Sequence, residues 1–196
     1  MKKGAVTRAR ILDRAFRLAG RHGVEGVSLG ALASDLGLSK SGLFAHFASK
    51  EELSVEVLRT TTERFAERVI RPALSAPRGE PRIRKMFDYW LAWLKAPDLP
   101  GGCPIVAASV ELDDKPGVPR DFLVKAQTEL LGTLAKAASL AVAEGHFRKE
   151  LDTELFAFEL MGVMLAYHHS LRLLRDERAT DRARAAFERL LADSRS

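Results

Sequence analysis

The segment from Ser28 to Phe47 carries side chains suited to contact a polyanion. A short helical pattern after Ser39 keeps two apolar residues, Leu43 and Phe47, four positions apart on one side. The other side is small, polar and basic, and such a helix is narrow enough to enter the major groove of DNA. The same pattern also fits an ordinary helical hairpin with a solvated second helix. The outward-facing residues are Lys40, Ser41, Gly42, Phe44 and Ala45.

A second group of chemically suggestive residues lies beyond residue 64. Aromatic and methionine side chains with a few polar groups among them are typical of the lining of a cavity for a lipophilic ligand. At helical spacing these residues also fit plain core packing. The candidate lining residues are Phe65, Met86, Phe87, Trp90, Trp93, Met164, Tyr167 and His168.

Catalytic and metal-binding patterns are weak in this chain. We find no nucleophile, base and acid at a spacing that indicates catalysis, so we expect a protein that is not an enzyme and has no cofactor. His168 and His169 are adjacent and point to different sides of a helix, so we expect no metal site. Cys103 precedes Pro104 at a predicted helix start, where a thiol pKa is lowered; a redox role and a small buried residue both remain open.

Length and composition indicate a globular protein of one sizeable core or two small domains. The chain has 196 residues, 46% of them hydrophobic, and its one cysteine excludes an internal disulfide. No apolar run approaches the roughly 20 residues that span a membrane. The charged N-terminus has no apolar stretch behind it, as a signal peptide would. We therefore expect a cytoplasmic protein without a membrane partner.

The net charge of +5 is confined to one end of the chain. Residues 1–72 hold 13 Lys and Arg against 8 Asp and Glu, whereas residues 73–196 hold 18 of each. Lys2 and Lys3 begin a predicted basic arm, and Arg8 beside it fits either a phosphate contact or a solvated helix face. Only the N-terminal part is therefore expected to meet phosphates.

The elements around the first group read as a helix-turn-helix. Ser28 is a good N-cap, Gly37 stands where a helix ends in a left-handed residue, and Ser39 caps a second helix two residues later. Two short helices joined by so tight a turn are the helix-turn-helix design.

No stretch alternates as a strand would, so we predict an all-α protein of about nine helices. Thr7 is expected to cap the first helix, which Gly23 ends. Ser49 and Glu52 form a capping box that opens a long fourth helix. Later helices are predicted after the turn at 75–81, from Pro104, over 120–144, from Asp152 and over 180–193.

One combination of residues at fixed spacing runs from about residue 5 to 55. It comprises Thr7-Arg8 with Ile11-Leu12, Gly23, Ser28, Ala33, Gly37-Leu38-Ser39-Lys40, Leu43-Phe44, His46-Phe47 and Ser49-Lys50-Glu51-Glu52-Leu53. This combination resembles the tetracycline-repressor (TetR) family of bacterial regulators. The resemblance implies a homodimer that binds a palindromic DNA operator and releases it when a small molecule enters the C-terminal domain.

The resemblance also implies contacts, residue by residue. In such proteins the third helix reads bases, and helix ends contact phosphates. Position 44 is usually tyrosine in the family, and Phe44 lacks the hydroxyl; either His46 takes over that bond or Phe44 packs on a thymine methyl or a sugar. The implied contacts are Ser28 and Lys50 to phosphates, Lys40, Ser41 and Gly42 nearest the base edges, and Phe44 and His46 against the DNA backbone; Ser39 and Ala45 are further candidate DNA-binding residues.

The predicted organisation follows from this resemblance. A helix-turn-helix DNA-binding domain occupies 1–50, a linking helix about 50–72, and a ligand-binding and dimerisation domain 73–196. Two C-terminal helices from each subunit would form a four-helix bundle that sets the two reading helices about 34–36 Å apart. The candidate dimer residues are Leu171, Leu174, Phe187, Leu190 and Leu191.

Two readings of the function therefore remain. The first is a sequence-specific transcriptional repressor with an unidentified, lipophilic effector, and activation instead of repression stays open. The second is a helical ligand-binding or catalytic protein whose helix-turn-helix serves protein contacts. A steep loss of DNA affinity with rising salt distinguishes the first from the second.

Overall fold

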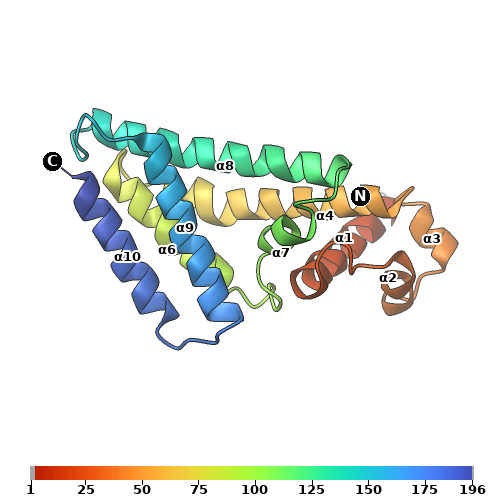
Figure 1. Cartoon of the computed structure of the whole chain (residues 1–196). Coiled ribbons are helices and arrows are strands. Elements are labelled where there is room, and N and C mark those ends of the chain that lie inside the picture. Colours follow the sequence, from red (N-terminus) through yellow and green to blue (C-terminus); the bar gives the residue numbers. More distant parts are fainter. Residues whose placement is uncertain (1–2, 196) are drawn as a thin grey trace. The chain divides into compact units, whose positions relative to one another are not determined.

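The computed structural model describes residues 3–195, and every regular element in that range is helical (Figure 1). This confirms the predicted all-α fold, with nine helical segments when the continuous run over 50–73 is counted once. The elements are α1 (Lys3–His22), α2 (Leu29–Asp35), α3 (Lys40–Phe44), α4 (Lys50–Phe65), the π-helical η1 (Ala66–Ile70), α5 (Arg71–Ala73), α6 (Glu80–Leu94), α7 (Pro104–Glu111), α8 (Val118–Ala143), α9 (Thr153–Arg172) and α10 (Ala179–Ser194).

Most predicted helix caps are confirmed. The Ser28 and Ser39 hydroxyls accept hydrogen bonds from the Ala31 and Gly42 amides, over 3.1 and 3.0 Å. Gly37 has a φ of +65°, as a helix-ending glycine requires. Side chains that bond amides two or three residues away satisfy groups that the helix leaves unpaired at its start.

The capping box before α4 is shifted by one residue. The Glu52 amide donates to the Ser49 hydroxyl over 3.0 Å, as predicted. The Glu52 carboxylate, however, accepts from the Ala48 amide over 2.8 Å. Two amides at the start of α4 are still satisfied reciprocally, as a capping box requires.

Two predicted helix starts are wrong. Thr7 does not cap α1, because the helix already begins at Lys3 and Thr7 lies inside it. The predicted basic arm therefore loses Lys3 to the helix, and its other residue, Lys2, lies outside the described residues. α8 begins at Val118 instead of Arg120, because Pro119 is tolerated in a first turn whose amides have no helical partner.

The chain divides into two compact units, and the division is discontinuous. Unit 1 comprises the residues up to Arg64 together with Ala96–Lys125, and unit 2 comprises Phe65–Lys95 and the chain from Ala126 onward. Segment 96–125 thus leaves unit 2 and returns to it. The division predicted from the sequence, with a linking helix over 50–72, stays a prediction. No helix within residues 3–195 is both long and apolar enough to cross a bilayer.

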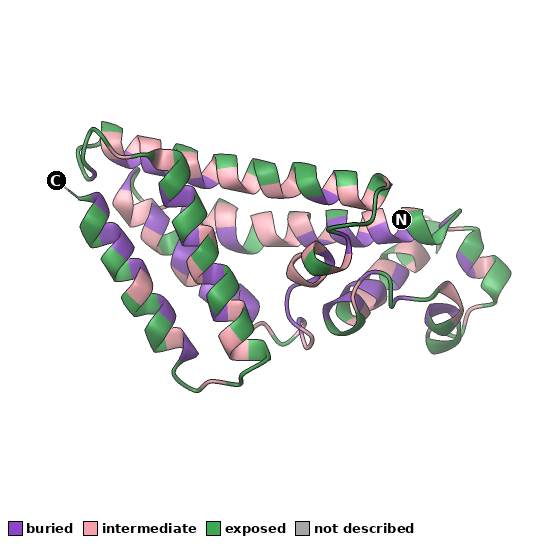
Figure 2. Cartoon of the chain, in the orientation of Figure 1, coloured by how far each residue is buried: buried purple, intermediate pink, exposed green. Residues whose placement is uncertain are grey.

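Unit 1 has one core shared by the helix-turn-helix and segment 96–125. Figure 2 shows its buried residues as stripes along the helices. Ala108, Leu112 and Leu123 are each at most 5% exposed and join this core. Burial of apolar surface is the main stabilising term in folding, so segment 96–125 is part of what holds the helix-turn-helix. The core residues contributed by the first four helices and the turns between them are Ile11, Ala15, Ala19, Val24, Val27, Leu32, Ala33, Leu43, Phe47, Leu53, Val57 and Leu58.

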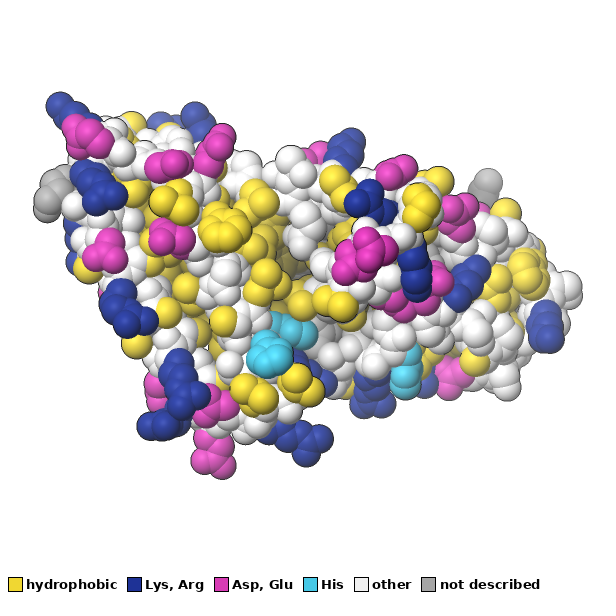
Figure 3. Space-filling view, in the orientation of Figure 1, with side chains coloured by type: hydrophobic (Ala, Val, Ile, Leu, Met, Phe, Trp, Pro, Cys, Tyr) yellow, Lys and Arg dark blue, Asp and Glu magenta, His cyan; other side chains and the backbone are white. Residues whose placement is uncertain are grey.

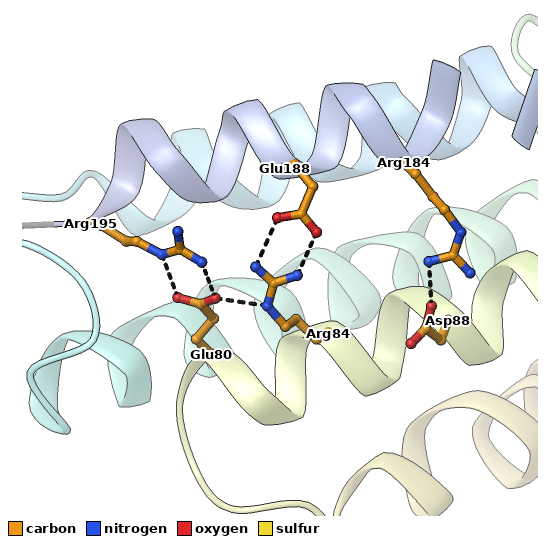
Figure 4. Close-up of polar contacts among 6 residues, drawn as sticks. All are labelled: Glu80, Arg84, Asp88, Arg184, Glu188 and Arg195. Atoms are coloured by element: carbon orange, nitrogen blue, oxygen red, sulfur yellow. Dashed lines mark hydrogen bonds and ion pairs between the residues drawn. The ribbon is translucent and has the colours of Figure 1, made fainter. Parts of the chain in front are cut away.

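In unit 2, charged side chains join α6 to α10 (Figure 4). Arg84 bonds both oxygens of Glu188, over 2.5 and 2.8 Å, and also Glu80 over 2.8 Å. Arg195 bonds Glu80 over 2.9 and 2.5 Å. Hydrogen bonds from Arg195 and then Arg84 lower the pKa of Glu80 to about 2, against the opposing effect of burial. We call these four residues the α6–α10 ion cluster.

Candidate nucleic-acid interface

α3 is anchored from inside and exposed outside, as the sequence predicts. Leu43 and Phe47 are fully buried in the unit 1 core. Lys40, Ser41 and Ala45 are exposed, and the Phe44 ring is 48% exposed. Because α3 is held only by its inner face, its outer face is available to a groove of nucleic acid.

The N-terminal end of α3 presents hydroxyl groups close together. The hydroxyls of Ser39 and Ser41 lie 3.1 Å apart, and the Ser39 oxygen also accepts from the Gly42 amide. Gly42 is half-buried against this cap, since a Cβ placed on it would lie 3.0 Å from the Ser39 oxygen. The predicted base-reading end is therefore compact, with Lys40 as its only cation.

Ser28 can both cap α2 and bond a phosphate. Its oxygen accepts from the Ala31 amide, and its hydroxyl proton remains as a donor. Ser28 is exposed. The amide dipoles of the first helical turn point toward a group bound at this serine, so they favour an anion there in addition to the hydroxyl donor.

His46 lies beside the start of α1. It is half-buried, and a Cβ placed on Gly4 would lie 3.9 Å from its Cε1. Arg8, one turn further along α1, is bound inside unit 1: its guanidinium lies 4.7 Å from the centre of the Phe47 ring and pairs with Glu56 at 3.1 Å. Arg8 therefore does not lie on a purely solvated helix face, because it contacts Phe47 and Glu56, and its phosphate contact stays a prediction.

Lys50 is bonded to a turn that sequence reasoning missed. Its ammonium donates to the Glu25 carbonyl oxygen over 2.5 Å and lies 4.0 Å from the Glu25 carboxylate. The lysine side chain is 43% exposed. No local pattern signals this contact, because it joins residues 25 positions apart.

The candidate ligand-pocket residues fall into separate groups in unit 2. The Phe65 ring meets the Trp90 and Trp93 rings edge-on, with centroids 5.1 and 5.8 Å apart. Phe87 instead stacks on Phe187 of α10 at 3.9 Å. Tyr167 points to α10 as well, where its hydroxyl lies 3.3 Å from that of Thr180. The structure thus brings three of the eight residues into one aromatic cluster and uses two in helix packing.

The other three candidate pocket residues are placed as follows. Met86 is buried beside a groove between α6 and α8 that it lines with Ile70 and Leu74. Met164 is buried on α9. His168 is half-buried with an Nε2 that has no hydrogen-bond partner, and burial, more than the nearby charges, lowers its pKa. A neutral imidazole with one open nitrogen suits a polar contact in apolar surroundings.

The candidate dimer residues are mostly internal. Phe187, Leu190 and Leu191 are 9% exposed or less, because the face of α10 that carries them packs within unit 2. This corrects the expectation that they form an outer surface. Leu171 is half-buried, and Leu174 is 60% exposed beyond the end of α9.

The apolar outer surface of unit 2 comes instead from α9. Leu155, Phe158 and Leu165 are 52%, 70% and 43% exposed. Figure 3 shows hydrophobic side chains gathered over this part of the molecule. Beside them, a groove of about 720 Å³ between α9 and α10 has small residues in its walls, among them Gly162 and Ala166. Large exposed apolar patches of this kind mark association sites.

Among residues 3–195, no three His, Cys, Asp or Glu side chains lie together as a metal site would need. Cys103 is 7% exposed at the start of α7. Of its two readings, burial favours the small packed residue.

Two family profiles match the chain. Residues 11–57 match the profile described as "Bacterial regulatory proteins, tetR family". Residues 79–187, more than half of the chain, match "Tetracyclin repressor-like, C-terminal domain". The first match covers the helix-turn-helix, and the second covers α6 to most of α10.

Individual proteins agree with these matches. The HTH-type transcriptional regulator YezE of Bacillus subtilis (strain 168), itself uncharacterized, is 28% identical over 104 residues, which is 53% of this chain and 53% of YezE, so the match spans about half of that relative. A TetR transcriptional regulator from Chloroflexus aurantiacus J-10-FL is 26% identical, with 98% of this chain and 96% of that chain covered and a TM-score of 0.86. AibR, solved with isovaleryl coenzyme A and operator DNA, shares the fold at 23% identity over 91% of this chain and 94% of its own, with a TM-score of 0.73. Since both parts of the family's architecture are matched, the chain belongs to the tetR family of bacterial regulatory proteins.

Proposed function

We propose that the protein is a sequence-specific repressor that binds a palindromic DNA operator as a homodimer and leaves it when a small, lipophilic molecule binds unit 2. The observation that carries this proposal is α3, whose inner face is fixed by two fully buried side chains while its outer face exposes Lys40, Ser41, Phe44 and Ala45. A rigid helix with a compact polar outer face is what major-groove reading requires.

The proposed contacts divide by chemistry. Lys50 and Ser28 bond phosphates and set the register, while Lys40, Ser41 and Gly42 lie nearest the base edges. Because the three residues nearest the base edges include one long polar side chain, Lys40, much of the sequence preference is expected from DNA shape, bridging water and thymine methyl groups. Phe44 supplies an apolar contact to a methyl group or a sugar, and Ser39, Ala45 and His46 complete the surface.

Dimerisation is proposed through α9 and α10. The support is the exposed apolar row Leu155, Phe158 and Leu165 on α9 beside a groove lined by small residues. In a two-fold dimer the same surface of each subunit meets its copy, so the bulky side chains of one subunit can pack into the neighbouring groove of the other. Leu171, half-buried near the end of α9, and Leu174, exposed beyond it, are kept as proposed interface residues.

The proposed effector site uses the aromatic cluster of Phe65, Trp90 and Trp93. Edge-on aromatic rings suit an apolar molecule, and we propose that Met164 and the unpartnered nitrogen of His168, both on α9, add one apolar and one polar contact to it. AibR, which shares the fold, is known with an acyl coenzyme A. We propose the apolar class of effector for this chain, and we propose no catalytic activity.

The experiment that tests the proposal is selection of random duplex DNA by the purified protein, followed by titration of the selected site at several salt concentrations. We expect a palindromic site and a log–log salt slope of several units, since each neutralised phosphate adds about 0.9. No enriched site, or a flat slope, would contradict the proposal and favour the rival reading, in which the helix-turn-helix serves protein contacts.

A further inference from the structure

A carboxylate from α7 is bound by the backbone of the turn between α1 and α2. The two oxygens of Glu111 accept from the Val24 amide over 2.8 Å and the Glu25 amide over 3.1 Å. Successive amides that follow a left-handed residue form a concave nest for an anion. Gly23, with a φ of +72°, is that residue here. The turn and Glu111 thus form a built site within unit 1.

The fit around this carboxylate is close. A Cβ placed on Gly23 would lie 2.5 Å from both Glu111 oxygens, so another residue there would displace the carboxylate and would also strain the backbone at its positive φ. Nearby, the backbones of Gly20 and Gly101 approach so closely that a Cβ on Gly101 would lie 2.0 Å from the Gly20 carbonyl carbon. Segment 96–125 therefore holds the end of α1 and the following turn at two places.

The same turn holds Lys50. The Glu25 carbonyl accepts from the Lys50 ammonium over 2.5 Å, and the amide of the same residue donates to Glu111. An ammonium has three donors, so a carbonyl can orient it while the remaining protons reach a phosphate. A free lysine side chain loses much rotamer freedom when it binds, and a carbonyl that already restrains it reduces that loss.

We infer that Glu111 is a positioning residue for DNA binding: it fixes the 23–25 turn, and the turn orients the Lys50 ammonium toward a phosphate. This inference rests on the proposed function. Segment 96–125 is connected along the chain to unit 2 at both of its ends. On this inference the segment orients the phosphate-binding Lys50 through the carboxylate of Glu111.

The first test is a double-mutant cycle on the selected operator. Glu111→Gln keeps the size of the side chain and removes its charge, and we expect it to weaken operator binding by about fivefold, the effect of one charge-assisted hydrogen bond. In a Lys50→Ala background the same change should alter binding less than about twofold, because residues that act through each other are not additive. Asp114→Asn, an equal loss of charge at an exposed position after α7, is the matched control and should leave binding unchanged.

Two outcomes of the cycle would overturn the inference. One is operator affinity unchanged in Glu111→Gln, and the other is an equal loss with and without Lys50, which would indicate a general structural effect. If the wild-type protein selects no site, the proposed function is contradicted as well. If the wild type and Glu111→Gln bind the selected site equally well, only this role of Glu111 is contradicted.

The second test needs no DNA. We expect the Val24 and Glu25 amides to be protected from hydrogen exchange in the wild type and to exchange at least about tenfold faster in Glu111→Gln, with the other unit 1 amides unchanged. Equal exchange of these two amides in both proteins would show that the carboxylate does not hold the turn. Faster exchange throughout unit 1 would mean that the variant loosens the whole unit, and would also contradict a positioning role.

Discussion

The helix starts of unit 1 and the pairing of α6 with α10 in unit 2 depend on contacts of different range. In unit 1, the helices that carry the proposed DNA-binding surface begin at side chains that bond amides three residues away, as Ser28 and Ser39 do. In unit 2, α6 is tied to α10 by Arg84 with Glu188 and by Glu80 with Arg195, pairs more than 100 positions apart. The difference teaches that the helix starts of the proposed DNA-binding surface are encoded locally, whereas the packing of elements in either unit depends on distant pairs such as Glu111 with Val24 and Arg84 with Glu188.

The largest effect should come from filling the outer face of α3. We expect Gly42→Arg to lower operator affinity to the nonspecific level, a loss of about 10³-fold or more, because the new side chain keeps the helix out of the groove. The fold should persist, since the nearest atom to a new Cβ is the movable Ser39 hydroxyl at 3.0 Å. Operator binding is measured with thermal unfolding of the same sample.

The matched control for this change lies in unit 2. Gly132 is an exposed glycine on α8 with no heavy atom within 4 Å of a Cβ placed on it. Gly132→Arg adds the same charge and bulk, and operator affinity should stay at the wild-type value. Equal losses in both variants would break the comparison, because DNA binding would then not depend on the outer face of α3.

The features that could be predicted from the sequence are those that depend on contacts between neighbouring residues. The caps at Ser28, Ser39 and Asp152 and the left-handed Gly37 were predictable, because each needs only a few neighbouring residues. The start of α1 was not, because Thr7 is a good cap in isolation but the helix continues past it to Lys3. A capping residue marks the start of a helix only where the helix does not extend past that residue in the folded protein.

It was harder to predict which residues pack against a helix face than to predict which face is buried. Helical spacing marked the apolar stripe of α10 correctly, but it could not say whether a second subunit or the chain itself covers it; Phe187 stacks on Phe87 of α6. In the same way, no pattern in the sequence pairs Glu111 with the amides of Val24 and Glu25, 87 and 86 positions away. Amphipathicity gives the direction of burial and leaves the identity of the neighbour open.

The second-largest effect should come from the outer face of α9. We expect Phe158→Glu, at a side chain that is 70% exposed, to give a folded monomer in sedimentation. Its apparent operator affinity should fall by about 100-fold, because two linked half-site contacts raise the effective concentration of the second. Leu74→Glu changes another apolar residue of unit 2 with 51% exposure and should remain dimeric. A dimeric Phe158→Glu protein with normal operator binding would remove α9 from the proposed interface.

The α6–α10 ion cluster should affect stability and leave DNA recognition alone. The pKa of Glu80 is lowered in the fold from 4.5 to about 2, so its contribution is complete above pH 4.5 and is lost as the pH falls toward 2. We expect Glu80→Gln to reduce the free energy of unfolding at pH 7 by about 2 kcal/mol. The variant should also lose stability less steeply than the wild type between pH 4.5 and 2.

The control for Glu80 is an exposed glutamate of the same unit. Glu150→Gln should leave the free energy of unfolding at pH 7 unchanged, because Glu150 lies exposed in the turn before α9. Operator affinity of Glu80→Gln at a temperature where it is fully folded should equal that of the wild type. A reduced affinity under those conditions would mean that the ion cluster acts on the DNA-binding surface, against the contrast between the two units.

The smallest effect is expected for Lys50→Ala, which tests whether this residue of unit 1 contributes to DNA affinity or to sequence preference. Lys50→Ala removes one phosphate contact, so we expect binding to operator and to random DNA to weaken alike, by about fivefold, with a salt slope shallower by about 1. Lys149→Ala removes an equally charged, exposed side chain from unit 2 and should change neither quantity. If Lys50→Ala altered the preferred sequence while its affinity for random DNA stayed the same, Lys50 would lie at a base edge, and the 23–25 turn that holds it would take part in choosing the operator sequence.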